Sequence, residues 1–212
     1  MKLADTQMKL LLNVVFVLIC FSSCVRRQYL PNDSKYNSIA TLNDSIWYGT
    51  GKINRIISPG ERIEDSKLID LYIQTDIPYK GLSAGPNKPT HNGCVDSDCI
   101  VTQSLLIQNI PLKKGKYRLG KLMKLTESSY PGRFEYIGNS GGVNKRYLDT
   151  GSKSNWVRIN KIDKNTGFVD GQIAFTFKED SALFARIDND MPLYLEFKNC
   201  LFRIKIKDVF LK

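Results

Sequence analysis

The sequence predicts an all-β domain, an antiparallel β-sandwich or barrel of about eight to ten strands with little helix. Apolar and polar residues alternate over many short runs, which is the period of half-buried strands. Turn-forming residues separate these runs. No ten-residue stretch combines a helical period with caps, and helical patterns do not alternate with the strands, which argues against a parallel α/β sheet.

The strands of this domain are predicted to begin near Ile46 and Trp47. The clearest alternations place the following residues on one face of their strands: Ile69, Leu71 and Ile73; Ile173, Phe175 and Phe177; Leu193, Leu195 and Phe197; Phe202, Ile204 and Ile206. The last run interleaves with Arg203, Lys205 and Lys207. Because buried cations without partners are costly, this basic face is expected to remain in water.

Turn signals fall between these strands. Asp163-Lys-Asn-Thr-Gly167 predicts a turn in which Gly167 adopts a positive φ angle. Lys198-Asn199 predicts a tight hairpin between the last two strands. Residues 111–115 separate two further strands, and residues 76–98, rich in proline and glycine, predict a long loop that is either functional or mobile.

A targeting segment precedes the domain. Residues 10–21 form an apolar run that is interrupted once by an asparagine. A bilayer-spanning helix needs about 20 apolar residues, so the run fits the signal helix of a secretory peptide. The small residues Ser22 and Ser23 follow, and then Cys24. Phe21-Ser22-Ser23-Cys24 resembles the lipobox of bacterial lipoproteins, in which the cysteine thiol receives diacylglycerol and the chain is cut before it, here between Ser23 and Cys24.

These features predict three regions. Residues 1–23 form the signal peptide, residues 24–44 comprise the lipidated cysteine and a flexible tether, and residues 45–212 form a single β domain. Met8 would also make a well-formed signal start, so both Met1 and Met8 are candidate initiators. A plain secretory signal in which Cys24 is incidental is the alternative interpretation.

The lipid on Cys24 predicts a protein anchored to a membrane through its acyl chains, because two chains already give stable anchoring. Surface-exported lipoproteins of the Bacteroidota resemble one another in carrying acidic residues after the cysteine. This chain has Val25-Arg-Arg-Gln28 there. The expected location is therefore the cell envelope, at the periplasmic face of the outer membrane.

The order of motifs in the domain resembles small uncharacterised lipoproteins of the Bacteroidota. The matching segments are Ile46-Trp47-Tyr48-Gly49, the series Ile110, Pro111, Gly115, Tyr117 and Leu119, the strands from Ile159 to Asp163 and from Val169 to Phe177, and the closing positions Asn199 and Phe202. Cys200 stands where these proteins more usually have glycine. The resemblance covers most of the mature chain. It implies a β-rich fold and transfers no activity and no catalytic residue.

Three cysteines follow the lipobox. Cys94 and Cys99 lie in one loop and could close a short disulfide in an oxidising compartment. Cys200 lies between apolar strands and is predicted to be a buried free thiol. The single histidine, His91, lies in a loop sequence without other ligands at zinc spacing, so no metal and no cofactor other than the lipid on Cys24 is expected.

The chain carries a formal net charge of +10, which favours anionic partners, although scattered lysines also keep an exported domain soluble. Nucleic acid is disfavoured by the compartment and by the lack of a binding motif. The leading hypothesis is a non-enzymatic domain that binds an envelope protein or a glycan. Its contact surfaces would be the loops 76–98 and 138–154 and exposed members of an aromatic set, Trp47, Tyr48, Tyr130 and Tyr147, unless these rings pack in the core.

Two other functions remain open at this point. One is a lipocalin-like barrel that carries a small hydrophobic ligand. The other is an envelope hydrolase that uses paired carboxylates across a cleft. A solid apolar interior would argue against the first, and the second needs two close acidic side chains of dissimilar burial.

Overall fold

The computed structural model describes residues 29–82, 91–96, 99–122, 130–181 and 191–211. Within them the chain forms ten strands and one 3₁₀ turn, η1 (Leu119–Lys121). The strands are β1 (Ser38–Leu42), β2 (Ser45–Ile57), β3 (Leu68–Thr75), β4 (Gln103–Pro111), β5 (Gly115–Arg118), β6 (Gly132–Ile137), β7 (Val143–Asp149), β8 (Trp156–Ile162), β9 (Phe168–Glu179) and β10 (Tyr194–Phe210). The prediction of an all-β fold with little helix is confirmed for this part of the chain.

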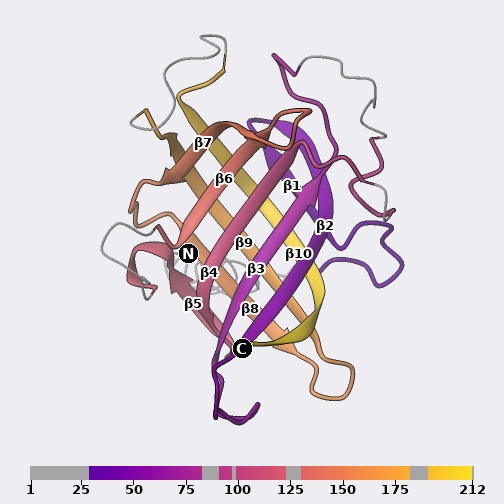
Figure 1. Cartoon of the computed structure of the whole chain (residues 1–212), viewed down its shortest axis with the longest axis vertical. Coiled ribbons are helices and arrows are strands. Elements are labelled where there is room, and N and C mark those ends of the chain that lie inside the picture. Colours follow the sequence, from indigo (N-terminus) through magenta and orange to yellow (C-terminus); the bar gives the residue numbers. More distant parts are fainter. Residues whose placement is uncertain (1–28, 83–90, 97–98, 123–129, 182–190, 212) are drawn as a thin grey trace, which may run out of the picture.

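The strands close into a barrel. Eight of them follow one another round a hydrogen-bonded ring in the order β1, β2, β3, β4, β6, β7, β9, β10. In Figure 1, β3, β4 and β6 lie in front, and β8, β9 and β10 cross behind them with the opposite tilt. Neighbours are antiparallel except that Ile53–Ile57 of β2 run parallel to Ile206–Phe210 of β10. The short strand β1 lies between β2 and β10 elsewhere along the barrel.

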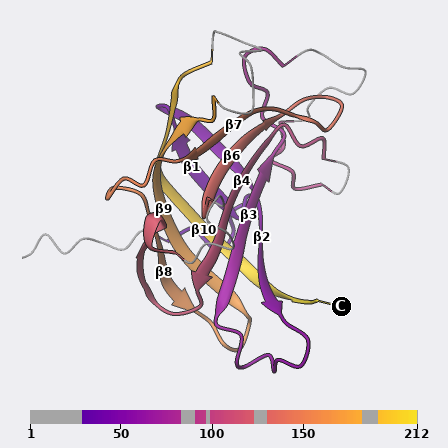
Figure 2. The ribbon, with the colours of Figure 1, turned by 60° about the vertical axis from the view of Figure 1, so that its left-hand side comes forward.

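On one side the ring closes through a short ladder only. β9 pairs with β7 only over Phe177–Glu179, and most of its other half pairs with β8. β8 in turn pairs with β5, which ends the sheet. β6 pairs with Gln103–Ile107 of β4, and no other strand of the described residues pairs with the remainder of β4 on that side. β4 and β5 are therefore separated by a gap in the hydrogen-bonded ladders, called the lateral opening below. Figure 2 shows β8 beside β9, the strand with which it pairs.

The interior of the barrel is filled with large side chains. Phe134 lies at the centre of an aromatic cluster, with its ring centroid 5.0 Å from that of Tyr136 and 5.4 Å from that of Phe197. Trp47 contacts Phe197 edge to face at 5.2 Å and donates its indole N–H to Gln103 at 3.0 Å. Each such aromatic pair contributes about 0.5–1.5 kcal/mol beyond its buried area. The core is thus a packed solid built from alternate residues of the strands.

The predicted apolar faces are largely confirmed. Ile69, Leu71 and Ile73 are all buried, as are Ile173, Phe175 and Phe177. Leu193 is the exception, because it precedes β10 and is 59% exposed. The turn at Asp163–Gly167 also forms as predicted: the Gly167 N–H donates to the Asp163 carbonyl at 2.8 Å, and Gly167 has a φ angle of 75°.

The predicted hairpin at Lys198-Asn199 is wrong. These residues form a bulge within the continuous strand β10, between Phe197 and Cys200 in the ladder with β9. Asn199 adopts a φ angle of 49°. Asparagine tolerates this left-handed conformation and is therefore frequent in turns, but here the conformation forms a bulge. The bulge places two consecutive side chains outward, so that Phe197 and Phe202 can both remain buried.

The folded domain begins earlier than residue 45. Ser38–Leu42 form β1, which lies within the segment predicted to be a tether, and Leu30 is 4% exposed. β1 is short and partly polar, and it is stabilised by ladders to β2 and to the distant strand β10. Such long-range pairing has no local signature in the sequence. Residues 1–28, with Ser23 and Cys24, lie outside the described part of the chain.

Candidate functional site

A run of basic residues lies along the free edge of the sheet. Residues 113–121 contain five cations and no acid: Lys113, Lys114, Lys116, Arg118 and Lys121. The run covers the edge strand β5 and the 3₁₀ turn η1 that follows it. Pairing with β8 adds Arg158, which lies directly opposite Lys116, and Trp156, which lies opposite Arg118. The fold therefore gathers cations that are dispersed in the sequence.

The cations of this edge repel one another, and contacts with an aromatic ring offset part of that repulsion. Like charges directly opposite each other in a sheet are destabilising. The Lys116 ammonium lies 4.2 Å from the ring centroid of Trp156, and the Arg158 guanidinium lies 5.4 Å from it. Cation–π contacts of this kind are worth about 0.5–1 kcal/mol at exposed sites. Among the described residues, no carboxylate forms an ion pair with either cation.

A cleft occupies the lateral opening between β4 and β5. Its volume is about 450 Å³, and its lining residues are Leu68, Asn109, Pro111, Lys116, Tyr117, Arg118, Lys121 and Leu122. Apolar side chains and one aromatic ring form much of the surface, and three cations stand around it. Such a cleft suits a ligand that combines an apolar or ring-shaped body with negatively charged groups.

A second hollow of about 630 Å³ adjoins the cleft and shares Leu68 and Asn109 with it. Its lining includes Glu61, Asp65 and Asp70. Asp70 accepts a hydrogen bond from the backbone N–H of Asn109 at 2.9 Å, yet its burial raises the pKa of the carboxyl above the ordinary value. The two hollows thus form a continuous surface with a basic and an acidic end.

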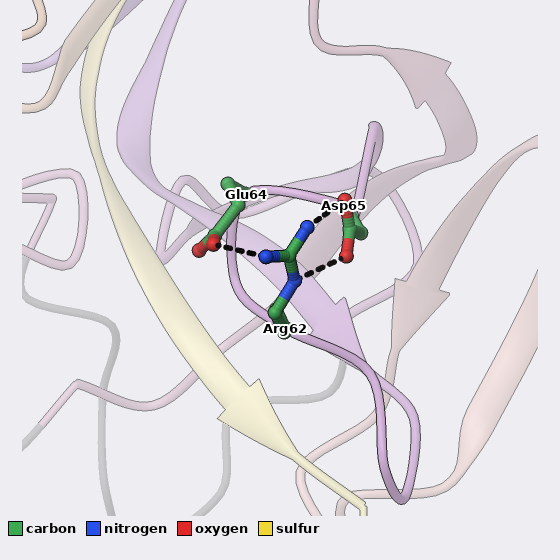
Figure 3. A network of polar contacts seen from close by, with 3 residues as sticks. All are labelled: Arg62, Glu64 and Asp65. Carbon is green, nitrogen blue, oxygen red and sulfur yellow. Dashed lines mark hydrogen bonds and ion pairs between the residues drawn. The ribbon is translucent and has the colours of Figure 1, made fainter.

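The exposed acids near this second hollow are engaged in local contacts. The Arg62 guanidinium binds Asp65 at 2.8 Å and Glu64 at 3.5 Å, as Figure 3 shows. Glu61 accepts a hydrogen bond from the backbone N–H of Ser58 at 3.0 Å. These contacts organise the connection between β2 and β3. Asp70, which is half-buried in the hollow, takes no part in them.

The predicted aromatic surface is wrong for two of its four members. Trp47 and Tyr147 are buried in the barrel, and the Tyr147 hydroxyl donates to the carbonyl of Pro192 at 2.9 Å. Both side chains fall on the inward phase of their strands, which is why they pack in the core. Tyr130 is 46% exposed just before β6. Tyr48 is half-buried and stacks on Tyr36, with 4.2 Å between the ring centroids.

The described parts of the loop 76–98 are held firmly against the barrel. Asp76 is fully buried and accepts the backbone N–H groups of Asn92 and Gly93, at 3.1 Å and 2.7 Å. Cys94 and Cys99 form a disulfide, with 4.9 Å between their Cα atoms. Residues 83–90 and 97–98 lie outside the described part. The loop 138–154 contains a turn closed by the Gly138 and Gly142 backbone, and then β7.

Cys200 is a buried free thiol, as predicted. Complete burial raises its pKa to about 12, so it stays protonated and unreactive at neutral pH. His91 is exposed. Among the described residues no group of three or more His, Cys, Asp or Glu side chains could hold a metal ion. No helix in the same residues is long and apolar enough to cross a bilayer.

The sequence contained part of the signal for the basic cleft. The five cations of residues 113–121 are visible as a run, but the sequence does not show that Arg158 and Trp156 join them. No protein-family model matches the chain, and neither a curated protein nor a solved structure matches it.

Proposed function

We propose that this chain is a lipid-anchored domain of the bacterial cell envelope that binds an anionic partner, a glycan or a protein, without catalysis. The lipobox-like segment ending at Cys24 supports the anchor and a location at the periplasmic face of the outer membrane. The observation that supports binding is the cleft between β4 and β5, where cations that have no acidic partner among the described residues surround an apolar surface.

The cleft is a better ligand site than the inside of the barrel. The core is filled by rings such as Phe134, Phe177 and Phe197, all of which are fully buried. A lipocalin-like carrier would need that volume for its ligand. The cleft, by contrast, lies at the surface and presents ammonium and guanidinium groups, which recognise carboxylate, sulfate or phosphate.

The anchor is tested by metabolic labelling with palmitate followed by fractionation of the cells. Wild-type protein is expected to incorporate the label and to sediment with membranes. The Cys24→Ser variant should lose both properties. Cys20→Ser is the matched control, because Leu18 and Ile19 before Cys20 are too bulky for a lipobox, and it should behave as wild type. Release of the Cys24→Ser variant no greater than that of wild type would contradict the anchor.

Binding is tested by comparing the anionic glycans and envelope proteins retained by immobilised wild-type chain with those retained by Arg118→Glu/Lys121→Glu. Charge reversal at the cleft should abolish retention of a specific component. Lys153→Glu/Lys164→Glu is the control, because these exposed lysines carry the same charge outside the cleft. Equal retention by both double variants would count against the cleft.

The same assay separates binding from hydrolysis. If the retained glycan were shortened during incubation, and Asp70→Asn abolished the shortening, the protein would be an enzyme and the non-catalytic part of the proposal would be wrong. Asp70 is the appropriate probe because it is a half-buried acid of the adjoining hollow and partial burial raises its pKa.

A further inference from the structure

A third hollow lies along the ladder between β5 and β8 and shares Lys116 with the cleft. Its volume is about 360 Å³, and its lining residues are Lys114, Gly115, Lys116, Arg158, Ile159 and Asn160. Every residue belongs to the pair β5–β8 or to the segment immediately before β5. Within it, Lys114, Lys116 and Arg158 supply positive charge, and the described residues place no acid among the lining.

Asn160 makes this hollow a built site. It is the additional residue of a bulge in β8, since Ile159 pairs with Gly171 and Lys161 pairs with Asp170. Asn160 is 4% exposed, and its amide Nδ2 is buried without a hydrogen-bond acceptor among the residues that the structure describes. A buried donor without an acceptor lowers stability, so such a group calls for a partner that supplies the missing atom, such as an ordered water or a bound ligand. The missing atom here is an acceptor.

The charges around Asn160 point to the same ligand chemistry. Lys116 and Arg158 lie directly opposite each other across the ladder, and both contact the ring of Trp156. The ring holds two like charges close together, which is unfavourable until an anion lies between them. Local violations of this kind are expected at functional sites.

From these observations we propose that the β5–β8 hollow binds a phosphoryl group. A phosphate carries up to two negative charges and several acceptor oxygens, whereas a carboxylate offers one charge and two oxygens. Once the Asn160 amide turns its buried Nδ2 toward the hollow, one oxygen would accept its N–H. Other oxygens would accept hydrogen bonds from the Arg158 guanidinium, and the ammonium groups of Lys114 and Lys116 would neutralise the remaining charge. This site requires neither the lipid anchor nor the partner of the β4–β5 cleft.

The test uses the whole chain in a neutral detergent, titrated with inorganic phosphate at constant ionic strength. The chain has two tryptophans, and Trp47 is buried in the core, so a saturable change in fluorescence reports on Trp156. Binding should also raise the melting temperature as phosphate increases. Chloride at the same ionic strength should produce neither change.

Two variants separate binding from a structural role. Lys116→Gln and Asn160→Leu should each weaken phosphate binding about tenfold or more, because each removes one charged or buried donor. Without phosphate their melting temperatures should equal or exceed that of wild type, since repulsion or an unmade hydrogen bond is removed. Lys164→Gln, an exposed lysine of the turn after β8, is the control and should retain wild-type affinity. Because Lys116 also lines the β4–β5 cleft, the Asn160→Leu variant decides between the two sites. Unchanged affinity in Asn160→Leu, or no saturable response of wild type, would overturn the proposal.

The source of the phosphoryl group is distinguished by two further ligands. Glycerol phosphate in solution represents a free phosphomonoester, and vesicles of phosphatidylglycerol in phosphatidylcholine represent a lipid headgroup. Loss of response in Asn160→Leu identifies the source that uses this site. If neither ligand binds in an Asn160-dependent manner, the phosphoryl assignment is wrong, whatever the outcome for the anchor and the cleft.

Discussion

Gly171 on β9 has no room for a side chain, because the backbone of a neighbouring strand and an aromatic ring both lie against it. A Cβ atom at this position would lie 2.6 Å from the carbonyl oxygen of Arg158 and would overlap the ring of Phe202. Gly171→Ala is therefore expected to lower the free energy of unfolding by roughly 1–3 kcal/mol. Urea denaturation measures the change. Gly142→Ala, where a Cβ would meet only the Ser140 hydroxyl at 3.7 Å, should be nearly neutral, and equal losses would contradict the steric explanation.

The raised pKa of Asp70 predicts how the stability of the chain depends on pH. Burial raises the pKa of its carboxyl, so the folded chain binds this proton more tightly than the unfolded chain. The contribution of Asp70 is therefore present below its unfolded pKa and is lost as the pH rises through its folded pKa. Asp70→Asn should gain stability relative to wild type between pH about 3.5 and about 7. Urea unfolding at the two pH values measures this difference.

Asp163 provides a control, because its pKa is shifted in the opposite direction from that of Asp70. Backbone N–H groups of Thr166 and Asn165 donate to its carboxylate and lower its pKa. The stability it contributes is present above its unfolded pKa and is lost as the pH falls through its folded pKa. Asp163→Asn should therefore lose stability relative to wild type at neutral pH more than at acidic pH. Parallel behaviour of the two variants would contradict the assigned directions.

Among the elements, β10 depends on its bulge. Asn199 has a φ angle of 49°, a conformation that β-branched residues adopt only with strain. Asn199→Val is expected to cost about 1–2 kcal/mol, whereas Asn199→Gly should be neutral or stabilising. Thermal unfolding of the two variants and of the neighbouring Lys198→Val provides the comparison. If valine were tolerated equally at both positions, the left-handed backbone would not be the constraint.

The charged residues of the edge strand β5 can have two roles, protection of the sheet edge and binding of a ligand. Its free edge offers backbone groups to another strand, and charged side chains on such an edge prevent this pairing. Lys116 and Arg118 meet that need, but edge protection does not require Arg158 to lie opposite Lys116 or Asn160 to be buried. Those additional features are the ones that the binding experiments address.

For the whole molecule, closure of the barrel depends on the short ladder between β7 and β9, with three paired residues on each strand. The Lys145 ammonium lies 3.3 Å from the Glu179 carboxylate across this junction, and both side chains are 8% exposed. Lys145→Met should lower the free energy of unfolding by about 3–5 kcal/mol, because it leaves a buried charge without its partner. The double variant Lys145→Met/Glu179→Leu should recover much of that loss. Chemical denaturation checks both, and a double variant as unstable as the single one would be inconsistent with this explanation.

Only part of the candidate site can be predicted from the sequence. The cations of residues 113–121 form a visible run, but Arg158 and Trp156 lie some forty residues further on and join them only through the β5–β8 ladder. Trp47 and Tyr147 resemble surface aromatics in the sequence, and only their phase in the barrel shows that they are buried. Burial of Asn160 depends likewise on a bulge relative to β9.

The sequence by itself determined the all-β class, the apolar face of strands such as Ile69–Ile73 and the turn at Asp163–Gly167, because neighbouring residues encode period and turn geometry. The tertiary structure decided that β1 lies between β2 and β10, that β10 continues through Asn199, and that β4 and β5 remain apart. Pairing and register depend on contacts between residues distant along the chain, where many partners are sterically acceptable and only the packing of the complete core selects among them.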